Sequence, residues 1–113
     1  MGKPIVYIAG PYTYPNPIHN INKVIKFANT LYKEGVIVPF IPHLNMMWDL
    51  VEPQTAGFFY EYDLHILSKC DALFKMPGLS IGAEKEVRFA KKHKIPVYTD
   101  IAELYKWARV VVA

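Results

Sequence analysis

Residues 78–90 of the chain, GLSIGAEKEVRFA, form the stretch from which the fold can be worked out. The apolar run before them, ALFKM at 72–76, is short enough for a strand and ends at a Pro-Gly pair. Ser80 is a residue type that caps helix N-termini, so we expect a helix from about Ile81 to about His93. The stretch therefore predicts a strand that turns directly into a helix.

The expected helix has a basic side and an apolar side when its residues are projected at about 100° each. The basic side holds Lys85, Arg88, Lys91 and Lys92. Glu84 lies at the edge of that side, where it can pair with Arg88 one turn later. Glu86 lies among the apolar residues instead, and a carboxylate there is costly to bury unless it is paired, protonated or used in chemistry. Glu86 is therefore a candidate site residue.

A second helix is expected over 58–69, and it carries the same anomaly. Asp63 lies in the middle of its apolar arc, whereas Glu61 and His65 share the polar one. Two helices that flank one strand, each with an inward acid, can bring Asp63 and Glu86 together, and Tyr7 near the end of the first strand can hydrogen-bond the nucleophilic acid. Such a pair suits chemistry at a glycosidic carbon. For each acid taken alone, a structural ion pair or a capped acid is the alternative.

The bulk composition is that of one globular domain covering residues 1–113. The chain is 52% apolar and 20% charged, with a formal net charge of +3. Eleven of the thirteen basic residues are Lys, and the aromatic cluster between Trp48 and Tyr62 contains no basic residue. This disfavours a nucleic-acid groove, which would pair basic residues with stacking aromatics.

Cys70 is the only cysteine, which excludes a disulfide within the chain and indicates a reducing compartment. We expect Cys70 to pack as a small buried hydrophobe. No apolar run reaches the roughly 18 residues of a membrane span, and the N-terminus lacks the apolar core of a signal peptide. We therefore expect a cytoplasmic protein.

The remaining segments alternate between strand and helix patterns. Strands are expected at 4–9, 36–40, 71–76 and 95–99, and helices at 17–34, 58–69, 81–93 and 101–107. Asn16, Thr55 and Asp100 are the expected caps of the other three helices. Pro39 places the second strand at the sheet edge or ends it early. The terminal run 110–113 is left open between a fifth short strand and a contact with a partner chain.

This alternation predicts a single α/β domain, a flavodoxin- or Rossmann-like three-layer fold with a four- to five-stranded parallel sheet. Ligands of such sheets bind beyond the carboxyl ends of the strands, here near Gly10–Thr13, Pro39–His43 and Pro77–Gly82. The segment 42–53 is the least regular, and Trp48 within it is either part of a plug over the core or the wall of a base-sized pocket. His43, directly after the second strand, is either a site residue or a structural one.

The glycine-rich corner at 78–82 can hold an anion at a helix N-terminus, but no Walker or dinucleotide motif is present. The four histidines, His19, His43, His65 and His93, lack the spacing of metal ligands, so we expect no metal site. Another functional alternative is a flavin-binding flavodoxin-like domain, and bound flavin would make the protein yellow.

Three motifs together resemble the nucleoside 2-deoxyribosyltransferase superfamily, which also contains the 2′-deoxynucleoside 5′-monophosphate N-glycosidases. They are Tyr7-Ile8-Ala9-Gly10-Pro11, then Asp63-Leu64 with Asp71-Ala72-Leu73, and then Gly78-x-Ser80-x-Gly82 with Glu86 and Ala90. The similarity runs from about Ile5 to Val97. It implies a homodimer with shared active sites and no cofactor.

The resemblance also implies residue roles. Glu86 matches the nucleophile that forms a covalent deoxyribosyl ester, Asp63 the acid that assists departure of the base, and Tyr7 the tyrosine that positions the nucleophile. Gly10, Ser80 and Gly82 match contacts to the 5′ end of the sugar. Thr13, His43 and Trp48 complete the expected set of substrate-binding residues.

Ser80 separates the two branches. Transferases carry an acid there that binds the free 5′-hydroxyl, whereas the monophosphate hydrolases carry a serine. This implies an N-glycosidase acting on a nucleoside 5′-monophosphate, although the loop after Gly10 lacks the hydrolases' phosphate-binding arginine. The alternatives are base exchange on free deoxynucleosides and a non-catalytic nucleotide-sensing module on the same fold.

Overall fold

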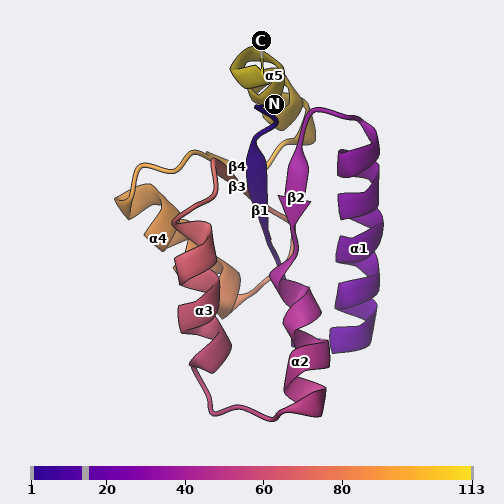
Figure 1. Cartoon of the computed structure of the whole chain (residues 1–113), viewed down its shortest axis with the longest axis vertical. Coiled ribbons are helices and arrows are strands. Elements are labelled where there is room, and N and C mark those ends of the chain that lie inside the picture. The colour runs from indigo at the N-terminus through magenta and orange to yellow at the C-terminus, as the bar shows by residue number, and fades with distance from the viewer. Residues whose placement is uncertain (1, 14–15, 113) are drawn as a thin grey trace.

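The computed structural model describes residues 2–13 and 16–112, in which strands and helices alternate (Figure 1). In chain order the elements are β1 (Ile5–Ala9), α1 (Pro17–Lys33), β2 (Val38–Phe40), the 3₁₀ turn η1 (Pro42–Leu44), α2 (Asn45–Val51), α3 (Phe58–Leu67), β3 (Ala72–Lys75), α4 (Ile81–Lys92), β4 (Val97–Tyr98) and α5 (Ile101–Val112). The alternation expected from the sequence is confirmed.

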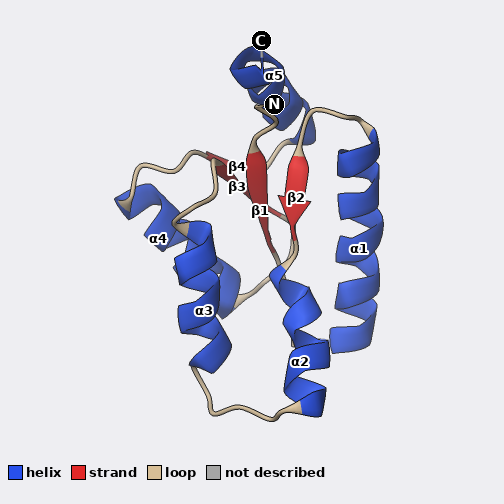
Figure 2. Ribbon diagram, viewed as in Figure 1, coloured by secondary structure: helices blue, strands red, loops and turns tan. Residues whose placement is uncertain are grey.

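The described strands form one sheet in the order β2-β1-β3-β4, and all pairs are parallel (Figure 2). Tyr7 in the central strand β1 pairs with Phe40 on one side and with Leu73 on the other. Because the chain moves outward from β1 to β2 and then returns to β3, the strand order reverses between β1 and β3. This is the position at which open parallel sheets bind ligands. Pro39 lies in an edge strand, as expected.

Helices cover both faces of the sheet, which gives the predicted three layers. On one face, Val24 and Leu31 of α1 and Leu104 and Ala108 of α5 pack against Val6 and Ile8. On the other, Leu67 of α3 and Ala83, Val87 and Ala90 of α4 pack against Tyr7 and Ala9. Successive residues of β1 therefore serve opposite cores, as the period of a strand requires. Cys70 packs in the second core as a small buried residue.

Three of the predicted helix caps are confirmed. The Ser80 hydroxyl accepts a hydrogen bond from the Ala83 amide at 3.1 Å, so α4 begins where the sequence indicated. The Asn16 side chain accepts from the amide of His19, and the Asp100 carboxylate accepts from that of Ala102. Each cap satisfies an amide that has no partner inside its helix.

Other local predictions are wrong. Helix α3 is capped by Gly57 with φ of 89°, not by Thr55, which contributes only its carbonyl to the Phe58 amide. Glu84 pairs with Lys75 of β3 at 3.7 Å instead of with Arg88, because Lys75 projects from the strand just before α4. Residues 110–112 continue α5 and form no fifth strand. Tyr14 and Ala113 lie outside the described residues.

The backbone of Gly78, in the loop after β3, lies close to the ring of Pro11, in the loop after β1. Gly78 has φ of 119°, and a Cβ added to it would lie 2.7 Å from Cγ of Pro11. Only glycine fits this conformation and this approach. The two loops are therefore held together at the carboxyl edge of the sheet. No helix among the described residues is long and apolar enough to cross a membrane.

Candidate active site

A cavity of about 240 Å³ opens at the carboxyl edge of the sheet, at the reversal point between β1 and β3. Gly10 and Tyr12 line it from the loop after β1, and Ser80, Gly82 and Glu86 line it from the beginning of α4. The rest of the lining comes from η1, α2 and α3. The cavity therefore lies where the topology alone places a ligand.

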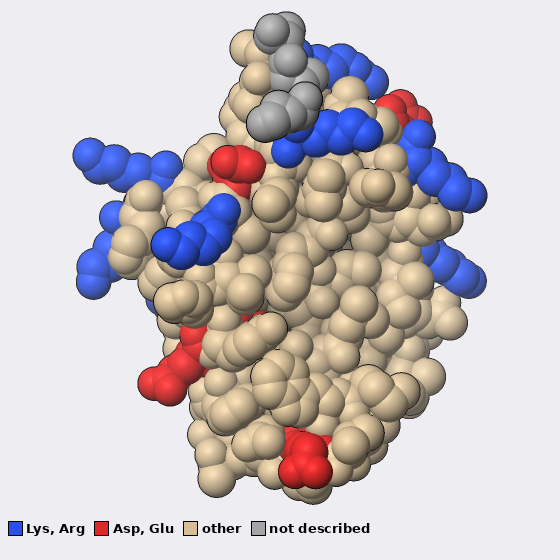
Figure 3. Space-filling view, viewed as in Figure 1, with Lys and Arg blue, Asp and Glu red and all other residues tan. Residues whose placement is uncertain are grey.

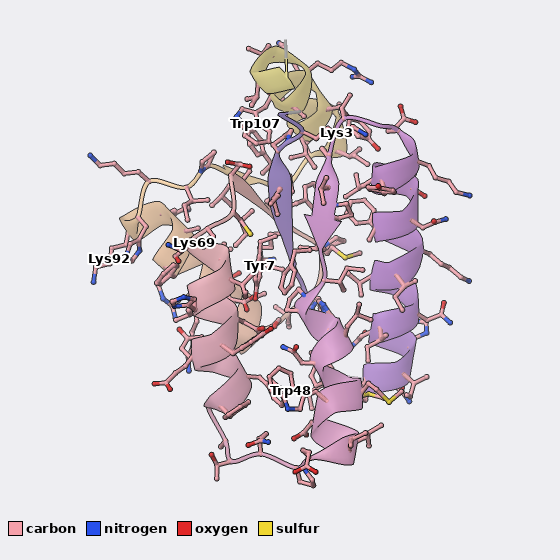
Figure 4. All side chains as sticks on the ribbon, viewed as in Figure 1. Lys3, Tyr7, Trp48, Lys69, Lys92 and Trp107 are labelled. Atoms are coloured by element: carbon pink, nitrogen blue, oxygen red, sulfur yellow. The ribbon has the colours of Figure 1, made fainter. Side chains whose placement is uncertain are left out.

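Glu86 and Tyr7 form the floor of the site. The Tyr7 hydroxyl donates a hydrogen bond of 2.5 Å to Oε2 of Glu86, between residues 79 positions apart in the sequence. Tyr7 has no solvent-exposed surface, and its ring packs against Phe40 of the neighbouring strand. Figure 4 shows Tyr7 near the centre of the molecule, at the carboxyl-terminal half of β1. A rigid buried phenol thus fixes the orientation of the Glu86 carboxylate.

Asp63 lines the same cavity from α3 and is 9% exposed. Its Oδ1 accepts a hydrogen bond of 2.8 Å from the side-chain amide of Asn45, at the beginning of α2. The two inward acids predicted from helix periodicity do converge, each with a different neutral partner. Among the described residues neither acid forms an ion pair with Lys or Arg.

Burial raises the pKa of both acids. The Glu86 pKa increases from 4.5 to about 7, mainly through desolvation, with a smaller increase from the charge of Asp63 and a decrease from the Tyr7 hydrogen bond. The Asp63 pKa increases from 3.8 to about 6 through desolvation, which the hydrogen bond from Asn45 opposes. Burial and the nearby carboxylates raise the pKa of Tyr7, so its phenol stays protonated and can donate. The pair can therefore hold one proton near neutral pH.

His43 also lines the cavity and is 4% exposed. Its Nε2 lies 3.1 Å from the carbonyl of Pro11, and its Nδ1 has no hydrogen-bond partner within the described protein. Burial lowers the pKa of the imidazole, whereas the Pro11 and Gly10 carbonyls oppose this shift. A neutral ring that donates from Nε2 keeps Nδ1 as a buried acceptor.

The corner at Ser80 and Gly82 combines a helix N-terminus with a small side chain. Because the Ser80 oxygen already accepts from Ala83, its hydroxyl proton is available to a ligand. The first amides of α4 have no partner inside the helix and carry its partial positive charge. This corner can therefore bind a hydroxyl or an anion.

Two predicted binding residues do not line the cavity. Trp48 packs edge-on against Phe58, Phe59 and Tyr62, and Figure 4 shows it beside the middle of α2, on the side of α3. Trp48 packs against Phe59, and Phe59 lines the cavity. Trp48 therefore supports the wall of the cavity from behind and does not line it. Thr13 is exposed on the loop after β1 and is likewise absent from the lining.

Sequence reasoning missed most of the wall formed by α2 and α3. Asn45, Asp49, Phe59 and Tyr60 line the cavity, and none was a predicted site residue. A signal was present for two of them, because Asn45 and Asp49 are four residues apart and share one helix face. It was obscured because no periodicity showed that the irregular segment 42–53 contains α2.

The cavity is acidic. Asp49, Asp63 and Glu86 line it, and none of the described Lys and Arg residues does. In the space-filling view, basic side chains lie in the upper half and at the sides of this face, whereas the lower half over α2 and α3 shows acidic side chains (Figure 3). Among residues 2–13 and 16–112, no group of three or more His, Cys, Asp and Glu could hold a metal ion.

Comparison with known proteins agrees with this architecture. The model of the family described as "Domain of unknown function (DUF7768)" matches residues 4–100. Among solved structures, the chain is similar to a 2-deoxyribosyltransferase from the psychrotolerant bacterium Bacillus psychrosaccharolyticus, with a TM-score of 0.58 and 18% sequence identity. The similarity covers 82% of this chain and 69% of that one, and at this identity it shows a shared fold. No curated protein matches the chain.

Proposed function

The chain belongs to the DUF7768 family, and from the two acids that meet in its cavity we propose that it cleaves the base–sugar bond of nucleoside 5′-monophosphates through a covalent glycosyl ester on Glu86. The observation that carries this proposal is the Tyr7–Glu86 hydrogen bond in a cavity shared with Asp63. The pKa of Asp63, raised to about 6, suits a proton donor, and the pKa of Glu86 of about 7 leaves part of this acid ionised near neutral pH, the form in which it can attack. The solved 2-deoxyribosyltransferase with the same fold supports this class of reaction.

In the proposed first step, the ionised Glu86 attacks C1′ of the sugar while Asp63 gives its proton to the departing base. The bond between C1′ and the base nitrogen breaks, and an ester between C1′ and Glu86 forms. In the second step, water attacks C1′, Asp63 takes the proton of that water, and Glu86 is released as a carboxylate. Tyr7 holds the Glu86 rotamer throughout, since its hydrogen bond restricts the carboxylate.

The Ser80 corner is the proposed site of the 5′-phosphate. The free hydroxyl proton of Ser80 and the first amides of α4 can donate to phosphate oxygens. Ser80→Asp tests this assignment, because aspartate also caps helices but places a negative charge at the corner. We expect the variant to stay folded and to lose its activity on monophosphates.

A second candidate is base exchange on free nucleosides, which the acidic lining favours. Within the part of the chain that the structure describes, three carboxylates and no Lys or Arg line the cavity, so a dianionic phosphate has no cation there to pair with. A sugar with a free 5′-hydroxyl carries no such charge. Incubation with nucleosides and their monophosphates, with and without an acceptor base, separates the two candidates.

The decisive measurement is base release from a panel of nucleotides and nucleosides by the protein and by Glu86→Gln. Release from monophosphates alone supports the hydrolase, and transfer between nucleosides supports the exchange enzyme. Ligand-dependent stabilisation with no release from any compound would instead support a nucleotide-sensing module and would overturn the catalytic proposal.

We further propose that the protein is a homodimer whose second copy covers the mouth of the cavity. Leu79 and Ile81 flank Ser80 and are 94% and 78% exposed. Met47 and Leu50 of α2 are also mostly exposed. Apolar side chains exposed around a site are typical of an interface. Light scattering on the protein and on Ile81→Asp tests this: the variant should be monomeric and less active, and an unchanged mass would count against the interface.

A further inference from the structure

We propose that Asp49 selects the base, by accepting a hydrogen bond from an exocyclic amino group, so that amino-bearing bases are preferred over their oxo counterparts. This inference rests on the proposed function, because it assumes that the cavity holds a nucleoside. It deepens that function by naming the class of base that is cleaved.

The position of the base follows from the positions of the two acids. Glu86 and Ser80 lie on the α4 side, where the sugar is proposed to bind, whereas Asp63 assists departure of the base from the α3 side. Asp63 accepts a hydrogen bond from Asn45, which begins α2. The base is therefore expected between α2 and α3, along the wall that Asn45, Asp49 and Phe59 line.

Asp49 lies one helical turn beyond Asn45 on the same face of α2. Four residues of helix span about 6 Å, which is comparable with the width of a pyrimidine ring. Because Asn45 touches Asp63 next to the glycosidic bond, Asp49 is placed at the far edge of the base. The exocyclic amino or oxo group of a purine or pyrimidine lies at that edge.

One oxygen of the Asp49 carboxylate accepts a hydrogen bond within the protein, and the other oxygen is available to a ligand. Its Oδ1 accepts a hydrogen bond of 2.9 Å from the backbone amide of Gln54, and this bond anchors the loop after α2. Within the described residues, no hydrogen bond or ion pair occupies its second oxygen. An ionised carboxylate only accepts hydrogen bonds, so this oxygen favours an N–H group and repels a carbonyl.

The alternative reading is that Asp49 only anchors its loop. Asp49→Asn separates the two roles, because the amide oxygen can still accept from Gln54 while its NH₂ group now faces the base. Glu52→Gln is the matched control, since it removes one negative charge just after α2 from a residue that does not line the cavity.

The experiment compares deoxyadenosine with deoxyinosine and deoxycytidine with deoxyuridine, each as nucleoside and as 5′-monophosphate. Base release gives kcat/KM for the protein, Asp49→Asn and Glu52→Gln. We expect the protein and Glu52→Gln to prefer the amino member of each pair by about tenfold, and Asp49→Asn to lose or reverse that preference. Equal rates on both members, or an unchanged ratio in Asp49→Asn, would overturn the inference.

Calorimetry with free adenine and hypoxanthine makes failure of this inference distinguishable from failure of the proposed function. Binding of the free bases requires no catalysis. If the protein prefers adenine and Asp49→Asn abolishes that preference, base selection is supported even if no substrate is cleaved. In that case only the proposed reaction at Glu86 would be overturned. Equal affinity for the two bases in the protein and in Asp49→Asn would overturn the base selection by itself.

Discussion

The two faces of the sheet are built on the same strand and packed in different ways. On the α1–α5 face, Val6 and Ile8 of β1 meet an apolar cluster that contains no buried acid. On the α3–α4 face, the alternate residue Tyr7 uses its ring for packing and its hydroxyl for a bond to a buried acid. The first face buries apolar side chains, whereas the second buries an ionisable group, which costs stability unless the group is put to use, as proposed for Glu86.

Among the variants, Glu86→Gln should have the largest effect on turnover, with no loss of stability. The amide cannot attack C1′, so base release should decrease by about 10³-fold or more. Stability should be equal or higher, because the variant removes a buried ionisable group but keeps its size. Base release and denaturant unfolding measured on the same sample check this. A variant with normal turnover would show that the nucleophile lies elsewhere.

Leu31→Ala probes the opposite face. Leu31 of α1 has no exposed surface, and its truncation leaves a cavity that should lower the free energy of unfolding by about 2–5 kcal/mol. Turnover per folded molecule should be unchanged at a temperature where the variant stays folded. Urea titration and active-site-normalised rates measure the two effects. Loss of turnover in fully folded Leu31→Ala would contradict the division of labour between the faces.

The pH dependence of stability should arise from the second face. In the folded protein the pKa of Glu86 is about 7 against an ordinary 4.5, so the folded state holds this proton more tightly. The resulting stabilisation is complete below about pH 4.5 and is lost as the pH rises through about 7. After allowance for solvent screening at the open cavity, we expect about 2 kcal/mol. Urea midpoints at pH 5 and pH 8 measure it, and Glu86→Gln should remove most of the difference.

Tyr7→Phe gives the smallest of the four effects. The ring still packs against Phe40, but Glu86 loses the hydrogen bond that orients it and lowers its pKa. We expect turnover to decrease about tenfold. The acidic limb of the pH–rate profile should move to higher pH, a shift that a purely structural role for Tyr7 would not produce. An unchanged pH–rate profile would show that Tyr7 does not influence the ionisation of Glu86.

Periodicity and caps predicted the fold well because both are local properties. Ser80 located the beginning of α4, and the inward positions of Glu86 and Asp63 followed from the helix period. Gly57 replaced Thr55 as the cap of α3 because a left-handed residue turns the chain sharply there. That conformation depends on the preceding loop, which the pattern did not describe.

The wall of the site was harder to predict because tertiary packing determines it. Trp48 was the most conspicuous aromatic residue, yet it packs behind Phe59, and the less conspicuous Asn45 and Asp49 line the cavity. The pairing of Asn45 with Asp63 depends on the relative positions of two helices. No spacing within either helix specifies it.

The contact of Gly78 with Pro11 has a consequence for how this protein can be modified. Since a Cβ at position 78 would lie 2.7 Å from Cγ of Pro11, libraries that vary this position should yield few folded members. The α2 wall carries no such constraint. Engineering for new nucleobases should therefore randomise α2 and leave the glycine corner untouched.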